Sequence, residues 1–372
     1  MKKPALFTPL EQPKTLLVGV HSPFNPIKDV ESYYQEFKSL AESNGVAAEY
    51  FIPIRLRSID PGYFLTQGKL DEVIDLIKKE HIEEVIFSDP LSPQQERNLN
   101  RVFGCRVFDR TDLILEIFEK GAQSAEGKTQ VALAMLQHQK SRLSGRGLSM
   151  SQQGGRIGTR GPGETQKEKD AQHIEHLMIK LRRDLERLHQ VRETQRKQRL
   201  SSQLPLICLI GYTNAGKSTI LNQLTKSNVL AEDKLFATLD TATRELFIEK
   251  QKIGLISDTV GFIQQLPHKL IEAFKSTLSE LQYAHLLVQV VDASDPNWED
   301  HIQVVHEVLE ELGAGDKDMV YVFNKIDKIQ NKEMFDFLFR NYQPHILVQA
   351  TSAEGIEPLK EFLLSWKREL VS

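Results

Sequence analysis

The segment Gly211-Tyr212-Thr213-Asn214-Ala215-Gly216-Lys217-Ser218 matches the phosphate-binding pattern G-x-x-x-x-G-K-[ST] at every fixed position. An apolar run, residues 204–210, precedes it, and a helical pattern begins at Ser218-Thr219 and continues to residue 224. A strand that leads through a Gly-rich turn into a helix directs backbone N–H groups and the positive helix end at phosphate. Lys217 would then reach the β- and γ-phosphates, and the Ser218 hydroxyl would bind Mg²⁺. The competing interpretation is an ordinary Gly-rich turn that caps a helix.

A second motif supplies the carboxylate that a nucleoside-triphosphate site needs near its metal. Asp258-Thr259-Val260-Gly261 follows a strand pattern at residues 252–257 and lies about 40 residues after the phosphate loop. Asp258 would hold Mg²⁺ through water, and the Gly261 N–H would contact the γ-phosphate. In isolation D-x-x-G is usually a turn, but at this distance from a phosphate loop it predicts the second half of the site.

The base is predicted to be guanine. Asn324-Lys325-Ile326-Asp327 follows a strand pattern at residues 319–323. The Asp327 carboxylate would accept hydrogen bonds from guanine N1–H and the exocyclic amine, a donor pair that adenine lacks. The Lys325 stem would cover the face of the base. Ser352-Ala353, followed by Glu354, comes after a further strand pattern, and its backbone is expected near the guanine O6.

Strand patterns alternate with helical ones along most of the chain, which predicts the α/β class with mostly parallel, doubly wound sheets. We expect three parts: a small α/β domain at residues 1–112, a helical hairpin at 113–200, and a nucleotide-binding domain of P-loop type at 201–372. In the last of these, the ligand would lie at the carboxyl ends of the strands. The N-terminal part lacks a complete phosphate loop, so a docking role is expected there.

The hairpin is predicted from an apolar seam at residues 174, 178, 181, 185 and 188, which repeats in steps of four and three residues. An earlier pattern, Ala132, Met135, Leu136 and Leu143, would pack antiparallel against it. Between them, residues 144–165 form a Gly-rich loop that carries Arg146, Arg156 and Arg160. Arginines bind phosphate bidentately and glycines permit close approach, so we expect structured RNA as the partner of this loop.

Composition restricts the alternatives. Residues 121–203 hold 16 basic and 8 acidic side chains, and acidic blocks flank them, which favours a polyanionic partner for the middle of the chain. An acidic membrane surface is disfavoured because the seam is narrow and lacks interfacial aromatic residues. Two distant cysteines in 372 residues exclude a disulfide framework, and no run is long and apolar enough for a membrane span. A cytoplasmic monomer is expected.

The catalytic apparatus departs from that of Ras-like enzymes. Phe262 stands where a Gln usually orients the attacking water, so hydrolysis by Lys217 and Gly261 alone should be slow. Gln264 and Gln265 lie nearby, although both also fit exposed loop positions. Asn214 is typical of guanosine triphosphatases that ligate K⁺ beside the phosphates, and such a cation would stabilise developing charge.

With these residues in place, the chain resembles the HflX family of translational guanosine triphosphatases, in the Obg-HflX group. The similarity covers nearly the whole chain and is most specific at Gly154-Gly155-Arg156-Ile157-Gly158-Thr159-Arg160-Gly161-Pro162-Gly163-Glu164-Thr165-Gln166. It also includes Leu91-Ser92-Pro93-Gln94-Gln95 and Asp109-Arg110-Thr111. The resemblance implies binding of GTP and GDP, binding to the 50S ribosomal subunit and its rRNA, ribosome-stimulated hydrolysis, and dissociation of stalled or idle 70S ribosomes.

The resemblance also bears on the segment Phe236-Ala237-Thr238-Leu239-Asp240-Thr241. The pattern itself leaves two candidates, Thr238 and Thr241, for the residue that closes over the γ-phosphate and completes the Mg²⁺ shell. Similarity to the A-T-L-D switch of the Obg-HflX group favours Thr238. Two other functions stay open on the sequence: an ATP-dependent RNA-remodelling protein with a second nucleotide in the N-terminal domain, and a GTP-gated scaffold that does not hydrolyse.

Overall fold

The computed structural model describes residues 13–23, 25, 27–144, 162–201, 204–225, 235–236, 242–265, 267, 279–329 and 339–371. The chain divides into two compact units. One comprises Met1–Glu116 with Gln139–Ala171, and the other comprises Ile117–His138 with Gln172–Ser372. The division passes through the two long helices of the hairpin.

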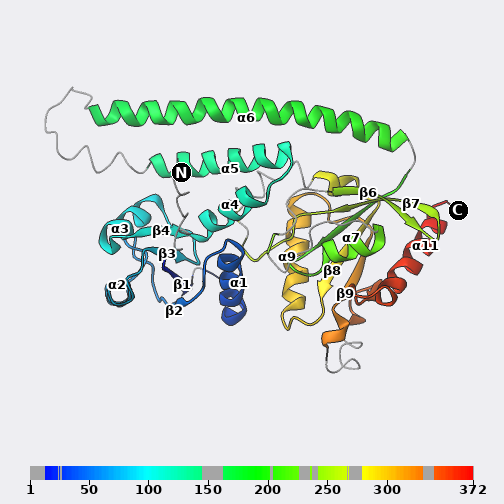
Figure 1. The fold of residues 1–372 in the computed structure, drawn as a ribbon, viewed down its shortest axis with the longest axis horizontal. Coiled ribbons are helices and arrows are strands. Elements are labelled where there is room, and N and C mark those ends of the chain that lie inside the picture. The colour runs from blue at the N-terminus through cyan, green and yellow to red at the C-terminus, as the bar shows by residue number, and fades with distance from the viewer. Residues whose placement is uncertain are drawn as a thin grey trace, which may run out of the picture. The chain divides into compact units, whose positions relative to one another are not determined.

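The first unit is built on a parallel sheet of four strands in the order β2-β1-β3-β4 (Figure 1). Its strands are β1 (Thr15–His21), β2 (Tyr50–Arg55), β3 (Glu84–Phe87) and β4 (Arg106–Asp109). The intervening helices are α1 (Val30–Ser43), α2 (Gln67–Glu80) and α3 (Pro93–Phe103), and α4 (Arg110–Gly121) follows. The predicted small α/β domain is therefore confirmed. β2 begins at Tyr50, where its pairing with Leu16 of β1 starts.

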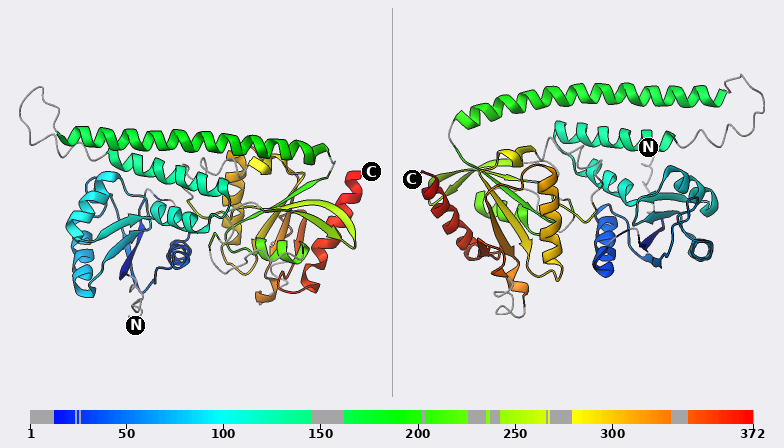
Figure 2. Two further views of the ribbon diagram at one scale, coloured as in Figure 1. Left: turned by 45° about the horizontal axis from the view of Figure 1, so that its top comes forward. Right: turned by 180° about the vertical axis from the view of Figure 1, so that it is seen from behind.

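The hairpin consists of α5 (Ala125–Ser144) and α6 (Pro162–Ser201), which run antiparallel and side by side (Figures 1 and 2). The 40 residues of α6 make a rod of about 60 Å at 1.5 Å per residue. The seam prediction holds best at Ile174 and Met178, which are 5% and 4% exposed. Residues 181, 185 and 188 are half-buried.

Two sequence predictions for the hairpin need correction. Residues 162–165, predicted as part of the loop, belong to α6, because Pro162 suits a first helical turn, where its missing N–H costs nothing. On α5 the deepest apolar side chains include Val131, Leu133 and Ala134, whereas the predicted Ala132, Met135 and Leu136 are only half-buried. Both sides of α5 are covered, so a single-face pattern does not describe it.

The second unit contains a sheet of six strands in the order β10-β9-β8-β5-β7-β6. They are β5 (Leu206–Gly211), β6 (Ala242–Ile248), β7 (Gln251–Asp258), β8 (Leu286–Asp292), β9 (Met319–Asn324) and β10 (His345–Leu347). All neighbours pair in parallel except β6, which pairs antiparallel with β7 at the edge. The mostly parallel sheet is confirmed, and β6 and β8 are strands that the sequence analysis left out.

The helices of this unit are α7 (Lys217–Thr225), α9 (Trp298–Glu311) and α11 (Glu357–Val371). Short 3₁₀ turns cover Ser279–Tyr283, Ile326–Lys328 and Glu354–Ile356. The core packs strand side chains such as Leu209 and Val288 against Ile220 of α7 and Leu359 of α11. Within the part of the chain that the structure describes, no helix is both long and apolar enough to cross a membrane.

Candidate nucleotide-binding site

The phosphate loop joins β5 to α7 and needs glycine at both of its fixed positions. Gly211 has φ 147°, and a Cβ there would lie 2.2 Å from the Val290 carbonyl oxygen. Gly216 has φ 98°, and its Cβ would lie 2.2 Å from the Asn324 amide nitrogen. Asn214 also has a left-handed backbone, with φ 59°. The loop conformation is therefore one that other residues at 211 and 216 would break.

Lys217 is held inside this loop. Its side chain is buried, and Nζ donates hydrogen bonds to the carbonyls of Gly211, at 3.1 Å, and Tyr212, at 2.7 Å. Burial lowers the pKa of the Lys217 ammonium to about 8, while the nearby Asp258 charge opposes the shift. An ammonium fixed here by backbone carbonyls is positioned to receive phosphate oxygens, and such a ligand would restore the charged form.

The two predicted metal ligands lie in contact. The Ser218 hydroxyl donates to Asp258 Oδ2 at 2.8 Å, and the Asp258 side chain is fully buried at the end of β7. Thr259 is fixed beside it, since its hydroxyl donates to the Leu209 carbonyl at 2.7 Å. A hydroxyl and a carboxylate at this separation form an oxygen donor set of the kind that a hard cation such as Mg²⁺ takes.

The segment after Asp258 is docked on the phosphate loop. The Thr213 N–H donates to the Phe262 carbonyl at 2.8 Å, and the Phe262 N–H donates to the Gly211 carbonyl at 3.2 Å. A Cβ on Gly261 would lie 2.8 Å from Thr213 Cγ2 and 3.1 Å from Lys217 Nζ. Gly261 thus lies against the lysine, and the Phe262 ring is buried with 1% exposure, so it offers nothing polar to a water molecule.

The guanine motif is joined to the phosphate loop through two side chains. Asn324 is buried and donates to the Ala215 carbonyl at 2.9 Å. Lys325 Nζ donates to the Asn214 carbonyl at 2.8 Å and pairs with Asp292 of β8 at 2.6 Å. Asp327 is exposed, which leaves its carboxylate accessible to a base edge.

The loop after β10 joins the same region. Asn324 Oδ1 accepts the Ala350 N–H at 3.0 Å, and the Ser352 hydroxyl accepts the Gly355 N–H at 3.0 Å. Ala353 and Glu354 are exposed beyond this turn. The structure therefore brings four separate sequence motifs to the carboxyl end of one sheet.

The remaining predicted residues divide into three groups. Thr219 and Ile326 are half-buried and Val260 is buried within the motifs already described. Phe236 packs edge-to-face on Phe118, with ring centroids 4.7 Å apart. The positions that fall outside the described residues are Ala237, Thr238, Leu239, Asp240, Thr241, Arg146, Arg156 and Arg160.

Two contacting residues were missed by sequence reasoning: Asp292, which binds Lys325, and His301, which stacks on Tyr212. Gln264, named above as a nearby loop residue, donates its backbone N–H to the Tyr212 hydroxyl. Asp292 could have been found, because it ends an apolar run at residues 286–291 in the way that Asp258 ends β7. No sequence signal pairs His301 with a residue almost 90 positions earlier.

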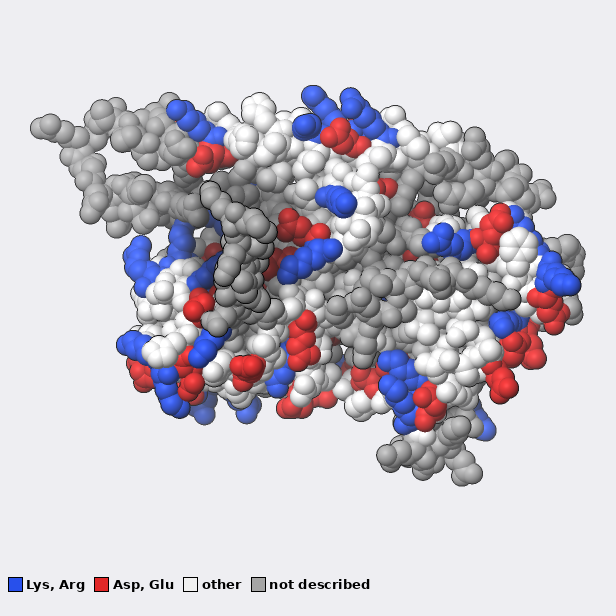
Figure 3. Space-filling view, viewed as in Figure 1, with Lys and Arg blue, Asp and Glu red and all other residues white. Residues whose placement is uncertain are grey.

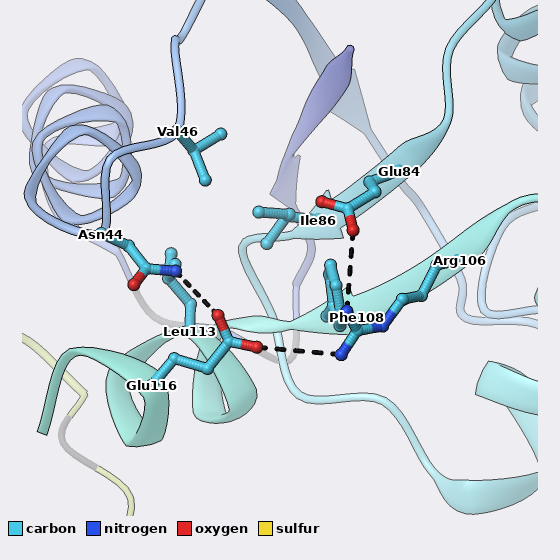
Figure 4. A pocket seen from close by; sticks show the side chains of 8 residues that line it. All are labelled: Asn44, Val46, Glu84, Ile86, Arg106, Phe108, Leu113 and Glu116. Atoms are coloured by element: carbon cyan, nitrogen blue, oxygen red, sulfur yellow. Dashed lines mark hydrogen bonds and ion pairs between the residues drawn. The ribbon is translucent and has the colours of Figure 1, made fainter. Parts of the chain in front are cut away.

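A cavity in the first unit bears on a second nucleotide site. In Figure 4 the Arg106 guanidinium reaches toward Glu84 and Glu116, at 3.6 and 3.8 Å, and Asn44 donates to Glu116 at 2.8 Å. The floor is apolar, with Ile86 and Phe108. Two carboxylates against one guanidinium make this cavity unfavourable for phosphate, so it lends no support to an ATP site there.

Comparison with known proteins agrees with this geometry. Family models match as a GTP-binding GTPase N-terminal region at residues 31–119, a GTP-binding GTPase middle region at 121–199, and a 50S ribosome-binding GTPase at 206–325. GTPase HflX of Escherichia coli (strain K12) is 42% identical over 347 residues, 93% of this chain and 81% of that protein. GTPase HflX of Caldanaerobacter subterraneus subsp. tengcongensis is 43% identical over 300 residues, which are 81% and 70% of the two chains.

Solved structures show the same fold at lower identity. A GTP-binding protein from the archaeon Sulfolobus solfataricus, crystallised with GDP, aligns at a TM-score of 0.50 and 23% identity, over 96% of this chain and 100% of that one. A complex of SsGBP with GDP aligns at a TM-score of 0.54 and 23% identity, over 96% and 99%. The sequence identities to the curated relatives extend over most of both chains, and so the chain belongs to the HflX family of GTPases.

Proposed function

We propose that the protein is a GTP-hydrolysing switch that binds the 50S ribosomal subunit, and that the ribosome stimulates its hydrolysis. The observation that carries the proposal is the convergence of Lys217, the Ser218–Asp258 pair, Gly261 and Asn324 at one sheet edge. We further propose that the parts 1–112, 113–200 and 201–372 act as separate modules, and that the protein is a cytoplasmic monomer that dissociates stalled or idle 70S ribosomes.

In this proposal the protein's own groups act mainly by positioning the phosphates, the metal and the base of GTP. Lys217 binds the β- and γ-phosphate oxygens, and the Gly261 N–H contacts the γ-phosphate. Ser218, Asp258 through water, and Thr238 would hold Mg²⁺, which neutralises charge on the transferring phosphoryl group. The Asp327 carboxylate selects guanine by accepting its two edge donors.

Intrinsic turnover should be slow because the position after Gly261 is a buried phenylalanine. Asn214 offers a route to faster turnover if it ligates K⁺ beside the phosphates, where a cation stabilises the charge that develops on them. GTP turnover would be compared in K⁺ and in Na⁺ at equal ionic strength, for the wild type and for Asn214→Ala. Equal rates in all four measurements would remove K⁺ from the proposal.

The described part of α6 presents a surface suited to RNA. His173, His176, Lys180, Arg183 and Arg187 recur at helical spacing on one face, opposite the buried Ile174 and Met178 seam, and all five are exposed. The face carries no acidic side chain between residues 172 and 183, although Asp184 flanks Arg187 at 3.6 Å. Lys and Arg side chains gather along the top of Figure 3, where α6 lies. We call these five residues the α6 basic face.

The α6 basic face extends about 20 Å along the helix, at 1.5 Å per residue. Its three cations, Lys180, Arg183 and Arg187, would neutralise phosphates and release their counterions. We also propose Arg146, Arg156 and Arg160 as residues that bind rRNA. Exposure and charge of this face support an RNA partner, and the family description of a ribosome-binding GTPase adds to that support.

Cosedimentation with 50S particles tests the proposal. The protein would be sedimented with a non-hydrolysable GTP analogue, GDP or ATP, and GTPase rates would be measured with and without ribosomes. We expect 50S binding with the GTP analogue only, and faster hydrolysis on ribosomes. Binding to 50S particles that does not depend on the nucleotide would contradict the proposal of a GTP-dependent switch. GTP-dependent binding without turnover would instead indicate a scaffold that does not hydrolyse GTP, the alternative that Phe262 leaves open.

Two triple variants that remove the same number of positive charges distinguish a specific contribution of the α6 basic face to 50S binding from an effect of net charge. Replacement of Lys180, Arg183 and Arg187 by Ala should weaken 50S binding and reduce its salt slope by about 2 to 3, because each lost phosphate contact removes about 0.9. The control replaces Arg57, Lys78 and Lys79, three exposed cations of the first unit, by Ala. Equal losses from the two triple variants would show that net charge, and not the α6 basic face, determines binding.

A further inference from the structure

Tyr212 occupies a variable position of the phosphate loop, yet its side chain makes two specific contacts. Its hydroxyl accepts a hydrogen bond from the Gln264 N–H at 2.7 Å. Its ring stacks on His301 of α9, with centroids 3.8 Å apart and planes 8° apart. The residue is 7% exposed. A phosphate loop binds phosphate through backbone N–H groups, so phosphate binding alone does not account for this side chain.

The tyrosine contact adds to two backbone contacts that dock the same segment. The Thr213 N–H and the Gly211 carbonyl both bind Phe262, at 2.8 and 3.2 Å. Three consecutive residues of the phosphate loop therefore hold the segment 262–264, and Tyr212 is the one that does so through its side chain. The docked segment keeps Gly261 against Lys217, where a γ-phosphate contact to the Gly261 N–H requires it.

Docking of the segment 262–264 on the phosphate loop also has an unfavourable term, which the favourable contacts must offset. The Thr213 hydroxyl is buried beneath the docked segment and has no hydrogen-bond partner among the described residues. A buried unpaired hydroxyl disfavours the state that buries it. The Tyr212 bond and the two backbone bonds therefore act against the Thr213 penalty in the docked state.

We propose that Tyr212 is a positioning residue for GTP hydrolysis: its hydroxyl holds the Gln264 backbone so that Gly261 faces the γ-phosphate, and His301 fixes its ring in that direction. The inference rests on the proposed GTP hydrolysis and explains how a phosphate loop and a segment 50 residues later stay in register. A GDP complex lacks the γ-phosphate, so GDP binding does not depend on this contact.

The test compares Tyr212→Phe with the wild type and with Tyr321→Phe. The control also loses a partly buried hydroxyl contact, from Tyr321 to His306 Nε2 at 3.2 Å, but on β9 outside the phosphate loop. Single-turnover GTP hydrolysis, affinity for a GTP analogue, affinity for GDP and thermal unfolding would be measured. For Tyr212→Phe we expect hydrolysis to fall about 3- to 10-fold, the value of one hydrogen bond. GDP affinity and unfolding temperature should match those of Tyr321→Phe.

The outcomes separate this inference from the proposed function. Wild-type protein that does not hydrolyse GTP would refute the proposed function itself. Wild-type hydrolysis that Tyr212→Phe leaves unchanged would overturn only the role of Tyr212. An equal fall in hydrolysis, GDP affinity and unfolding temperature would also overturn it, because a general structural defect moves all three.

Variants at His301 test the ring contact independently. His301→Phe keeps a flat partner for the Tyr212 ring and should retain hydrolysis within about twofold. His301→Ala removes the partner and should slow hydrolysis as Tyr212→Phe does. In the double variant with Tyr212→Phe the losses should not add, because both act on one contact. Additive losses, or a slow His301→Phe, would show that the stack serves another purpose.

Discussion

The side-chain amide of Asn324 donates a hydrogen bond to the Ala215 carbonyl across 2.9 Å, and so it joins the guanine motif to the phosphate loop. The same side chain accepts the Ala350 N–H at 3.0 Å. With 3% exposure it has no access to solvent that could replace either bond. One buried amide therefore joins the loop that follows β9 to the phosphate loop and to the loop that follows β10.

Asn324→Asp should weaken the binding of GTP and GDP together, by at least about tenfold, and lower the free energy of unfolding by about 1–3 kcal/mol. An aspartate cannot donate to the Ala215 carbonyl, and its charge would be buried. Equilibrium binding and urea denaturation measure the two effects. Asp327→Asn is the matched control: its side chain is exposed, so guanine affinity should fall while stability stays unchanged. A stable Asn324→Asp protein with normal affinity would contradict the role assigned to the amide.

Gly261→Ala should slow GTP hydrolysis by at least about tenfold while GDP affinity changes little. The added Cβ would lie 2.8 Å from Thr213 Cγ2, closer than real Cβ contacts come, and 3.0 Å from Thr213 Cα, so the contact between the docked segment and the phosphate loop must shift. Single-turnover hydrolysis and GDP titration provide the comparison. Normal hydrolysis by Gly261→Ala would show that close docking of this residue is not needed.

Thr213 and Thr259 form a pair for testing the cost of an unpaired hydroxyl. The Thr259 hydroxyl donates to the Leu209 carbonyl at 2.7 Å, whereas the buried Thr213 hydroxyl has no hydrogen-bond partner among the described residues. Thr213→Val should raise the free energy of unfolding of the nucleotide-free protein by about 1 kcal/mol, and Thr259→Val should lower it by about 1–2 kcal/mol. Denaturant titrations decide the signs. Destabilisation by both variants would mean that the Thr213 hydroxyl has a partner.

Nucleotide binding should take up a proton at alkaline pH. Burial lowers the pKa of Lys217 from 10.5 to about 8, so the folded protein binds fewer protons than the unfolded chain between these values. The free-energy penalty for burying the charged Lys217 therefore acts in full below about pH 8. It decreases as the pH rises toward 10.5, so the free energy of unfolding rises over this range. Phosphate oxygens favour the ammonium form and raise its pKa, so GDP should weaken in affinity as the pH rises above about 8.

Calorimetric GDP titrations in buffers of different ionisation enthalpy measure that proton directly. At about pH 8.5 the observed enthalpy should depend on the buffer, with an uptake of roughly half a proton or more. Near neutral pH, where Lys217 is already charged, uptake should be close to zero. An identical result at both pH values would exclude Lys217 as the titrating group.

Neighbouring residues of α6 test the seam of the hairpin. Met178 is 4% exposed and Leu177 is 37% exposed. Met178→Ala should lower the unfolding temperature clearly, since truncation of a buried Met costs about 2–5 kcal/mol. Leu177→Ala, which removes a side chain of similar size from the surface, should have a much smaller effect. Thermal unfolding of both variants, followed by circular dichroism at 222 nm, measures the two shifts. Equal shifts would place the hairpin contact on a different face of α6.

Much of the fold was predictable because it rests on local patterns. The strand patterns at residues 252–257 and 319–323 agree within one residue with β7 (Gln251–Asp258) and β9 (Met319–Asn324). The edge strand β6 was missed, since its sequence is only partly apolar and it pairs antiparallel in an otherwise parallel sheet. β8 was missed although its apolar run is plain, and with it the Asp292 partner of Lys325.

The sequence by itself determined the motifs that predict a nucleotide site and where the backbone turns from strand to helix. Both depend on residues adjacent in the chain, whose spacing reports the backbone geometry directly. The tertiary structure decided which of those residues support one another. Tyr212 meets Gln264 and Asn324 meets Ala215 across 52 and 109 positions of sequence. The order of strands in the sheet creates such contacts, and no local period encodes that order.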